Sequence, residues 1–96
     1  MTYRLLAPAA REIREAARYY EEKVPGLGFE LITEVRATIR RILAQPQAWS
    51  LLDDEIRRCR TSRFPYGIIY IVENDCILII SVMHLHRHPD NWRKNL

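Results

Sequence analysis

Cysteine and glycine are scarce in this chain, and their scarcity excludes several classes of protein. The 96 residues include two cysteines and three glycines. Cys59 and Cys76 fall in separate predicted strands without the spacing of a redox pair, so we interpret both as small structural residues. Gly26 and Gly28 lack the lysine and serine of a phosphate-binding loop, and no serine has the context of a hydrolase nucleophile.

Long apolar runs are also absent. No stretch approaches the roughly 18 to 20 residues that span a bilayer, and no basic segment followed by an apolar run marks a secretory signal. We therefore expect a cytoplasmic protein without membrane contact. A length of 96 residues and 48% hydrophobic content suffice for one domain without metal or disulfide, so residues 1–96 are assigned to a single domain.

Lysine is rare, since the basic residues are thirteen arginines and only two lysines. The net charge is +3. Arginine binds phosphate or carboxylate through two parallel hydrogen bonds. Arg57, Arg58, Arg60 and Arg63 fall within seven residues that contain no acid. Strand alternation places Arg58 and Arg60 on one face and Arg57 on the other. The cluster indicates a polyanionic or acidic partner, although the same charges would also protect an edge strand from aggregation.

Periodicity predicts one strand, then two helices, then several further strands. Residues 2–6 form a short apolar segment before Pro8, a residue that suits the first turn of a helix. Apolar positions at helical spacing predict helices over residues 9–23 and 29–44, separated by a breaker at residues 24–28. A further strand is predicted from Ile56 to about Thr61.

A β-hairpin is predicted near the end of the chain. Its strands are Tyr66–Glu73 and Cys76–Met83, joined by Asn74 and Asp75. The nearly continuous apolar run of the first strand is typical of a central strand. The resulting order is β-α-α-β-β-β, an α+β domain whose antiparallel sheet packs against an N-terminal helical hairpin.

Three histidines follow this hairpin at alternate positions: His84, His86 and His88, before Pro89. Alternate strand residues share a face, and imidazole binds zinc or nickel, but no carboxylate or cysteine cluster completes a metal site. We therefore expect no metal and no cofactor. Because histidine titrates near neutral pH, His84 and His86 are also candidates for proton transfer.

Three sequence blocks are distinctive in combination. They are the strand-helix-helix order that begins Tyr3-Arg4-Leu5, the run Arg58-Cys59-Arg60 before Phe64-Pro65-Tyr66-Gly67-Ile68-Ile69-Tyr70, and the ending Val82-Met83-His84-Leu85-His86-Arg87-His88-Pro89 with Trp92. Together they resemble the RelE/ParE superfamily of bacterial type II toxin-antitoxin toxins over nearly the whole chain. The resemblance implies a growth-arresting toxin that forms a hetero-oligomer with a cognate antitoxin.

The resemblance implies one of two targets. RelE-like members cleave messenger RNA on the ribosome, and a nuclease here would use His84, His86, Arg58 and Arg60 for proton transfer and phosphate neutralisation. ParE-like members instead poison DNA gyrase and are not enzymes. RelE-like nucleases carry an arginine three residues before the tyrosine that matches Tyr70, whereas this chain has a glycine there. This departure favours the ParE-like branch.

In the ParE-like interpretation, basic and aromatic residues near the sheet contact the target or another polyanion: Arg58, Arg60, Arg63, Arg87 and Trp92. An acidic or amphipathic antitoxin segment is expected to pair with an exposed sheet edge and to cover the helical hairpin. A small nucleic-acid-binding module, supported by the cationic strand alone, remains a further alternative.

Overall fold

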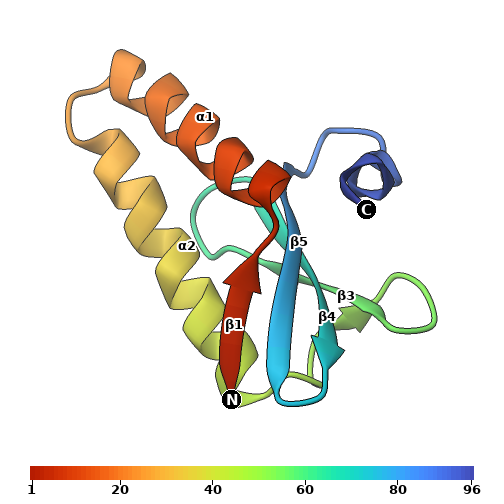
Figure 1. The fold of residues 1–96 in the computed structure, drawn as a ribbon. Helices are drawn as coiled ribbons and strands as arrows, with labels where there is room; N and C mark the ends of the chain where they lie inside the picture. Colours follow the sequence, from red (N-terminus) through yellow and green to blue (C-terminus); the bar gives the residue numbers. More distant parts are fainter.

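Two helices pack on one face of a five-stranded sheet in the computed structural model, which describes residues 1–96 (Figure 1). The α+β class is thereby confirmed. The strand order across the sheet is β1-β5-β4-β3-β2. The elements are β1 (Thr2–Leu5), α1 (Ala7–Lys23), α2 (Leu27–Ala44), β2 (Ser50–Leu51), β3 (Ile56–Arg60), β4 (Tyr66–Glu73), β5 (Cys76–His84) and a 3₁₀ helix, η1 (Asn91–Asn95).

The turn between α1 and α2 depends on two glycines and one carboxylate. Gly26 has a φ of 91°, which residues with a side chain rarely adopt. The Glu21 carboxylate accepts hydrogen bonds from the backbone N–H groups of Gly26 (2.8 Å) and Gly28 (3.0 Å), so it caps the start of α2. A Cβ atom at Gly28 would lie 2.4 Å from the Ala17 carbonyl oxygen, because the two helices approach closely there.

The predicted hairpin is present, with Asn74 at a φ of 55° in its turn. The sheet is not wholly antiparallel as predicted, because β1 pairs with β5 in parallel and the sheet is therefore mixed. Apolar periodicity predicts a strand but does not encode the direction of a neighbour far along the chain. The two-residue strand β2, at the other edge, was also not predicted.

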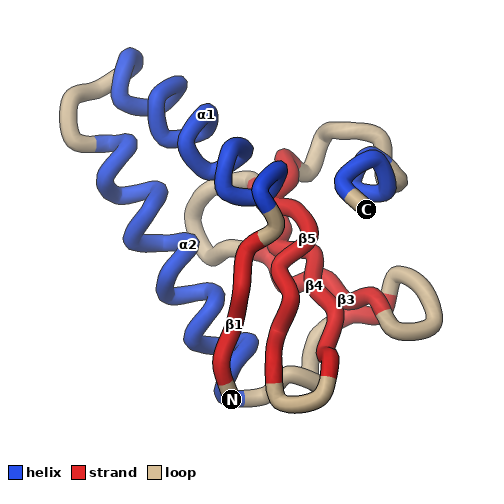
Figure 2. The backbone as a smooth tube through the Cα atoms, in the orientation of Figure 1, coloured by secondary structure: helices blue, strands red, loops and turns tan.

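The sheet separates a large core from a small one. On the helix side, α2 residues such as Leu31 and Ile42 pack with Ile68, Tyr70 and other sheet residues. On the opposite face, a smaller cluster is covered by the C-terminal segment (Figure 2). That cluster consists of Ile69, Ile80, Met83 and Trp92. No helix in the chain combines the length and apolarity required to cross a membrane.

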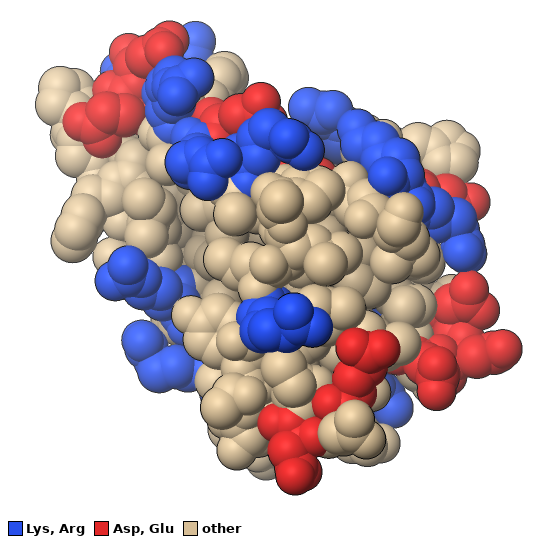
Figure 3. Space-filling view, viewed as in Figure 1, with Lys and Arg blue, Asp and Glu red and all other residues tan.

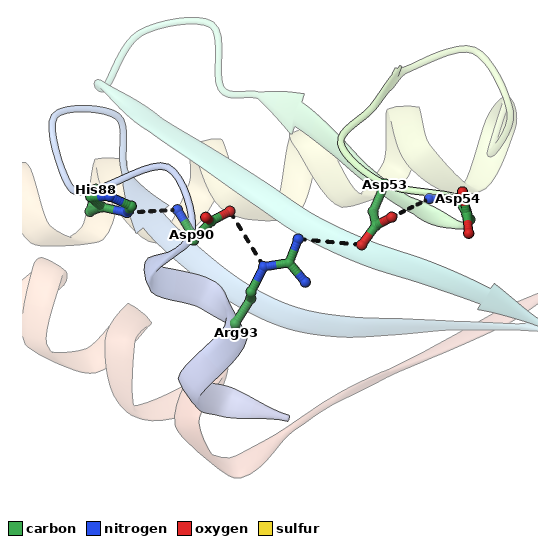
Figure 4. Close-up of polar contacts among 5 residues, drawn as sticks. All are labelled: Asp53, Asp54, His88, Asp90 and Arg93. Atoms are coloured by element: carbon green, nitrogen blue, oxygen red, sulfur yellow. Dashed lines mark hydrogen bonds and ion pairs between the residues drawn. The ribbon is translucent and has the colours of Figure 1, made fainter.

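Polar contacts hold the C-terminal segment against the sheet. The Arg93 guanidinium lies 3.3 Å from an Asp53 oxygen and 3.4 Å from an Asp90 oxygen (Figure 4). It also lies 4.4 Å from the centre of the Trp92 ring. The pKa of Asp53 is lowered by the hydrogen bond from the Asp54 backbone and by Arg93. Asn95 donates a 3.0 Å hydrogen bond to the Ile80 carbonyl of β5.

Candidate functional site

Most of the predicted site residues lie at one end of the sheet, where β3 ends, β4 begins and β5 ends. The pairs Arg60–Gly67 and Tyr66–His84 bring these strand ends together. We call this end the strand-end rim and define it by Arg58, Arg60, Tyr66, Gly67 and His84.

The opposite end of the strands is acidic. It includes the β2–β3 and β4–β5 turns, whose acids are Asp53, Asp54, Glu55, Glu73 and Asp75. In Figure 3, acidic side chains gather in the lower part of the view and again at the upper left, and basic ones form a band at the upper right. The two ends of the strands therefore differ in charge, while the remaining acids lie on α1, on α2 and before η1.

Arg58 and Arg60 lie on the sheet face opposite the helices, as their alternation predicts. Cys59, between them, is 1% exposed and belongs to the helix-side core. The stem of Arg58 crosses Gly67, because a Cβ atom at Gly67 would lie 2.9 Å from the Arg58 Cδ. The glycine thus provides the space that Arg58 occupies. Neither arginine forms an ion pair with an acid.

Arg63 lies in the β3–β4 loop and is bound to α2. Its guanidinium forms a 2.7 Å ion pair with Glu30. Its backbone N–H donates to the Glu34 carboxylate at 2.9 Å, and the same carboxylate accepts the N–H of Ser62. The charge of Arg63 is therefore offset, and its backbone is fixed to the helix.

His84 ends β5 on the helix side, with its ring 5.2 Å from that of Tyr66 and 4.9 Å from that of His86. Burial lowers the pKa of His84, and the nearby charges of His86 and Arg87 lower it further. Its Nδ1 accepts the His86 backbone N–H at 3.1 Å. The neutral ring therefore carries its hydrogen on Nε2, where it can donate a hydrogen bond but cannot act as a base.

His86 and His88 are exposed beyond the end of β5. His88 repeats the arrangement of His84, since its Nδ1 accepts the Asp90 backbone N–H at 3.2 Å. The imidazoles of His84 and His88 thus fix the chain that connects β5 to η1. No three His, Cys, Asp or Glu side chains form a group that could hold a metal ion.

Arg87 is exposed beside Tyr66 and has no acidic partner. Burial raises the pKa of Tyr66 to about 12, with Tyr20 adding to the shift and Arg87 opposing it. Tyr66 therefore keeps its proton at neutral pH and remains a hydrogen-bond donor.

The sequence analysis placed Trp92 among the target contacts, but the structure buries it. It is 1% exposed and packs with Ile69, Ile80 and Met83, because the η1 helix folds back onto the sheet. Its indole is part of the core rather than a free contact for a target. The sequence pattern missed this fold-back because η1 is too short to show a helical period.

Glu12 of α1 is a polar residue that the sequence analysis did not identify. Its carboxylate accepts hydrogen bonds from the Ser81 hydroxyl (2.9 Å) and from the Val82 backbone N–H (3.0 Å). Asn95 approaches the same carboxylate at 3.4 Å. Glu12 thus joins α1, β5 and the C-terminal segment at the edge of β5 that extends beyond β1.

Comparison with known protein families identifies the family of this chain. Residues 3–89 match the family described as ParE toxin of type II toxin-antitoxin system, parDE. The chain belongs to the ParE toxin family. This membership makes the protein a type II toxin and implies an antitoxin as its partner.

A solved structure supports the fold of this ParE-family toxin. The structure, described as the chromosomal ParDE TA system from P. aeruginosa, superposes with a TM-score of 0.79. The match has 14% sequence identity and covers 90% of this chain and 97% of that one. No curated protein sequence matches the chain.

The four residues expected to act if the protein were a nuclease are divided between the two faces of the sheet and the segment beyond β5. Arg58 and Arg60 project from the face opposite the helices, whereas Tyr66 is buried on the helix side and its paired residue His84 shares that side. His86 lies beyond the strand end and is exposed. The arginines and His84 thus project from opposite faces of the sheet.

Proposed function

We propose that this toxin arrests growth in the cytoplasm by inhibiting DNA gyrase through protein contacts, without catalysing a reaction. The observation that carries the proposal is the division of the arginines and His84 between the two faces of the sheet. A nuclease requires its base and its cations around one phosphate, whereas a binding surface does not. The parDE family membership supports the same conclusion.

Arg58, Arg60 and Arg87 are the proposed gyrase contacts, because they are cations without acidic partners at or beside the strand-end rim. Arg63 contributes less, since its guanidinium is already paired with Glu30. Arginines with two parallel donors bind acidic surfaces with defined geometry.

The test compares two double variants in growth arrest and in supercoiling by purified gyrase. Arg58→Gln with Arg60→Gln is expected to reduce both effects at least about tenfold, as loss of charge-assisted hydrogen bonds predicts. Arg36→Gln with Arg40→Gln, on the exposed side of α2, is the matched control and should retain both effects. Undiminished supercoiling in the presence of folded toxin would contradict the gyrase assignment.

A ribosome-dependent nuclease is the second candidate, because His84 has a lowered pKa and Arg87 adds a cation beside it. Primer extension on translated messages distinguishes the two targets. Gyrase inhibition predicts no cleavage. Codon-spaced cuts that disappear in His84→Ala would replace the gyrase proposal with RNA cleavage.

The antitoxin is proposed to add a strand to β1. The β1 strand is a four-residue edge, and its Tyr3 and Leu5 side chains are 43% and 38% exposed. The other edge, β2, has only two residues and is followed by three acids. An apolar, exposed edge can bind both the backbone and the alternate side chains of an added strand.

Proline substitution tests this edge directly. The backbone N–H groups of Thr2 and Leu6 donate to the backbone carbonyls of Asp75 and Ile79. Alternation along the strand therefore directs the Tyr3 N–H outward. Tyr3→Pro should weaken binding of the co-expressed antitoxin about three- to tenfold beyond the loss seen in Tyr3→Ala, because it removes one more donor. Equal binding of the two variants would exclude backbone pairing at this position.

A further inference from the structure

A cavity of about 560 Å³ lies between α1, the end of β5 and the C-terminal segment. It exists because β1 pairs only as far as Ile79, whereas β5 continues to His84. The last residues of β5 are therefore paired with β4 on one side and have no strand on the other, where β1 has ended. We call this cavity the α1–β5 pocket.

Two of the four backbone groups that Val82 and His84 direct toward this pocket are already bonded. The Leu85 N–H donates to Pro65, so alternation turns the backbone groups of Val82 and His84 away from β4 and toward the pocket. Glu12 accepts the Val82 N–H, and the His84 carbonyl accepts the Arg87 N–H. The Val82 carbonyl and the His84 N–H remain without a partner in the chain.

These two groups have the spacing that one residue of an added parallel strand requires. In a parallel ladder, a residue donates its N–H to one carbonyl and accepts the N–H two positions further along. The Val82 carbonyl and the His84 N–H fit that pattern. A segment bound there would continue the line of β1, which is itself parallel to β5.

Charges on the pocket walls determine the side chains of such a segment. Arg87 and Lys94 line one wall, and neither has an acidic partner. The Tyr66 hydroxyl lies near the same wall and keeps its proton. On the α1 wall, the Glu12 carboxylate is occupied by its three donors, and Glu15 is the remaining acid. A carboxylate is therefore favoured only on the wall of Arg87 and Lys94.

We propose that the α1–β5 pocket binds an extended, acid-bearing peptide segment of a partner protein, which runs parallel to β5. One of its residues pairs with the Val82 carbonyl and the His84 N–H, and an adjacent carboxylate binds Arg87 and Lys94. The proposal does not depend on gyrase as the target, so supercoiling results leave it unaffected.

The test uses the purified full-length protein and three probes. They are the capped peptide Ac-Val-Glu-Val-Glu-Val-NH₂, its analogue with glutamine for both glutamates, and a hexathymidylate oligonucleotide. Affinity is measured by titration, and the His84 backbone amide is followed by NMR. The glutamate peptide should shift the His84 amide and bind about tenfold more tightly than the glutamine peptide.

Variants identify the pocket as the binding site. Arg87→Gln should weaken the glutamate peptide about tenfold and leave the glutamine peptide unchanged, whereas Arg36→Gln on α2 should change neither. Absence of peptide binding at millimolar concentration, equal affinity for both peptides, or an unshifted His84 amide would overturn the proposal. Arg87-dependent binding of hexathymidylate that displaces the peptide would also overturn it, in favour of a phosphate site.

Discussion

Replacement of Trp92 distinguishes a core residue from a target contact. Trp92 is 1% exposed, packs with Ile69, Ile80 and Met83, and lies beneath the Arg93 guanidinium at 4.4 Å. Truncation of a buried tryptophan to alanine costs about 3 to 5 kcal/mol. Because η1 is short and terminal, it can partly collapse into the space, so we expect about 3 kcal/mol for Trp92→Ala.

A loss of that size should be readily measured. For a domain of this length, each kcal/mol lowers the melting temperature by about 4 to 8 °C, so Trp92→Ala should melt about 12 to 24 °C below the wild type by circular dichroism. Trp92→Phe keeps an aromatic ring in the same core and should cost about 1 kcal/mol. It should also arrest growth as the wild type does.

Two results would refute this reasoning. One is a Trp92→Ala protein that melts within a few degrees of the wild type, since the indole would then contribute little to the core. The other is a Trp92→Phe protein of normal stability that no longer arrests growth. In that case the indole would be required by the target after all.

Substitutions at three further positions test the fold around the site. Gly28→Ala should destabilise the protein by about 1 to 2 kcal/mol in urea unfolding. The steric overlap with the Ala17 carbonyl outweighs the preference of helices for alanine over glycine, which is about 1 kcal/mol. A stabilised variant would show that the two helices can separate freely. Glu12→Ala should cost about 2 kcal/mol by leaving the Val82 N–H unsatisfied, whereas Glu12→Gln, which keeps one acceptor oxygen, should cost less than half of that; equal losses would mean that the hydrogen bond to Val82 contributes nothing. The lowered pKa of His84 favours its neutral form in the folded state, so its contribution to stability is present above the unfolded value of 6.5 and is lost as pH falls through the lower folded pKa. The urea midpoint of the wild type should therefore decrease between pH 7.5 and pH 5 by more than that of His84→Gln, and parallel decreases would contradict this assignment.

The sequence alone was sufficient to predict those elements that a local residue pattern determines. The Asn74-Asp75 turn, the helical stripes and the opposite faces of Arg58 and Cys59 follow from short-range periodicity and were predicted. Residues that depend on distant contacts were not. Glu12 meets Val82 only after α1 packs beside β5, and Trp92 becomes buried only when η1 folds back across Ile80.

The candidate site divides in the same way. Its location at the strand ends was predictable, because Arg60 and His84 both end strands of one sheet. The pairing of Arg63 with Glu30 was not, since the two residues are brought together by the packing of α2 against the β3–β4 loop. The accepting role of the His84 Nδ1 was likewise invisible in the sequence, because it depends on the path of the chain after β5.

Five acids lie at one end of the strands and the unpaired Arg58, Arg60 and Arg87 lie at or beside the other, so the sheet contributes to a dipole moment of the molecule along its strands. In the field of an acidic partner, such a molecule turns with its arginine-rich end forward before contact occurs. Encounters are then oriented as well as accelerated, and both effects weaken as added salt shortens the range of the field.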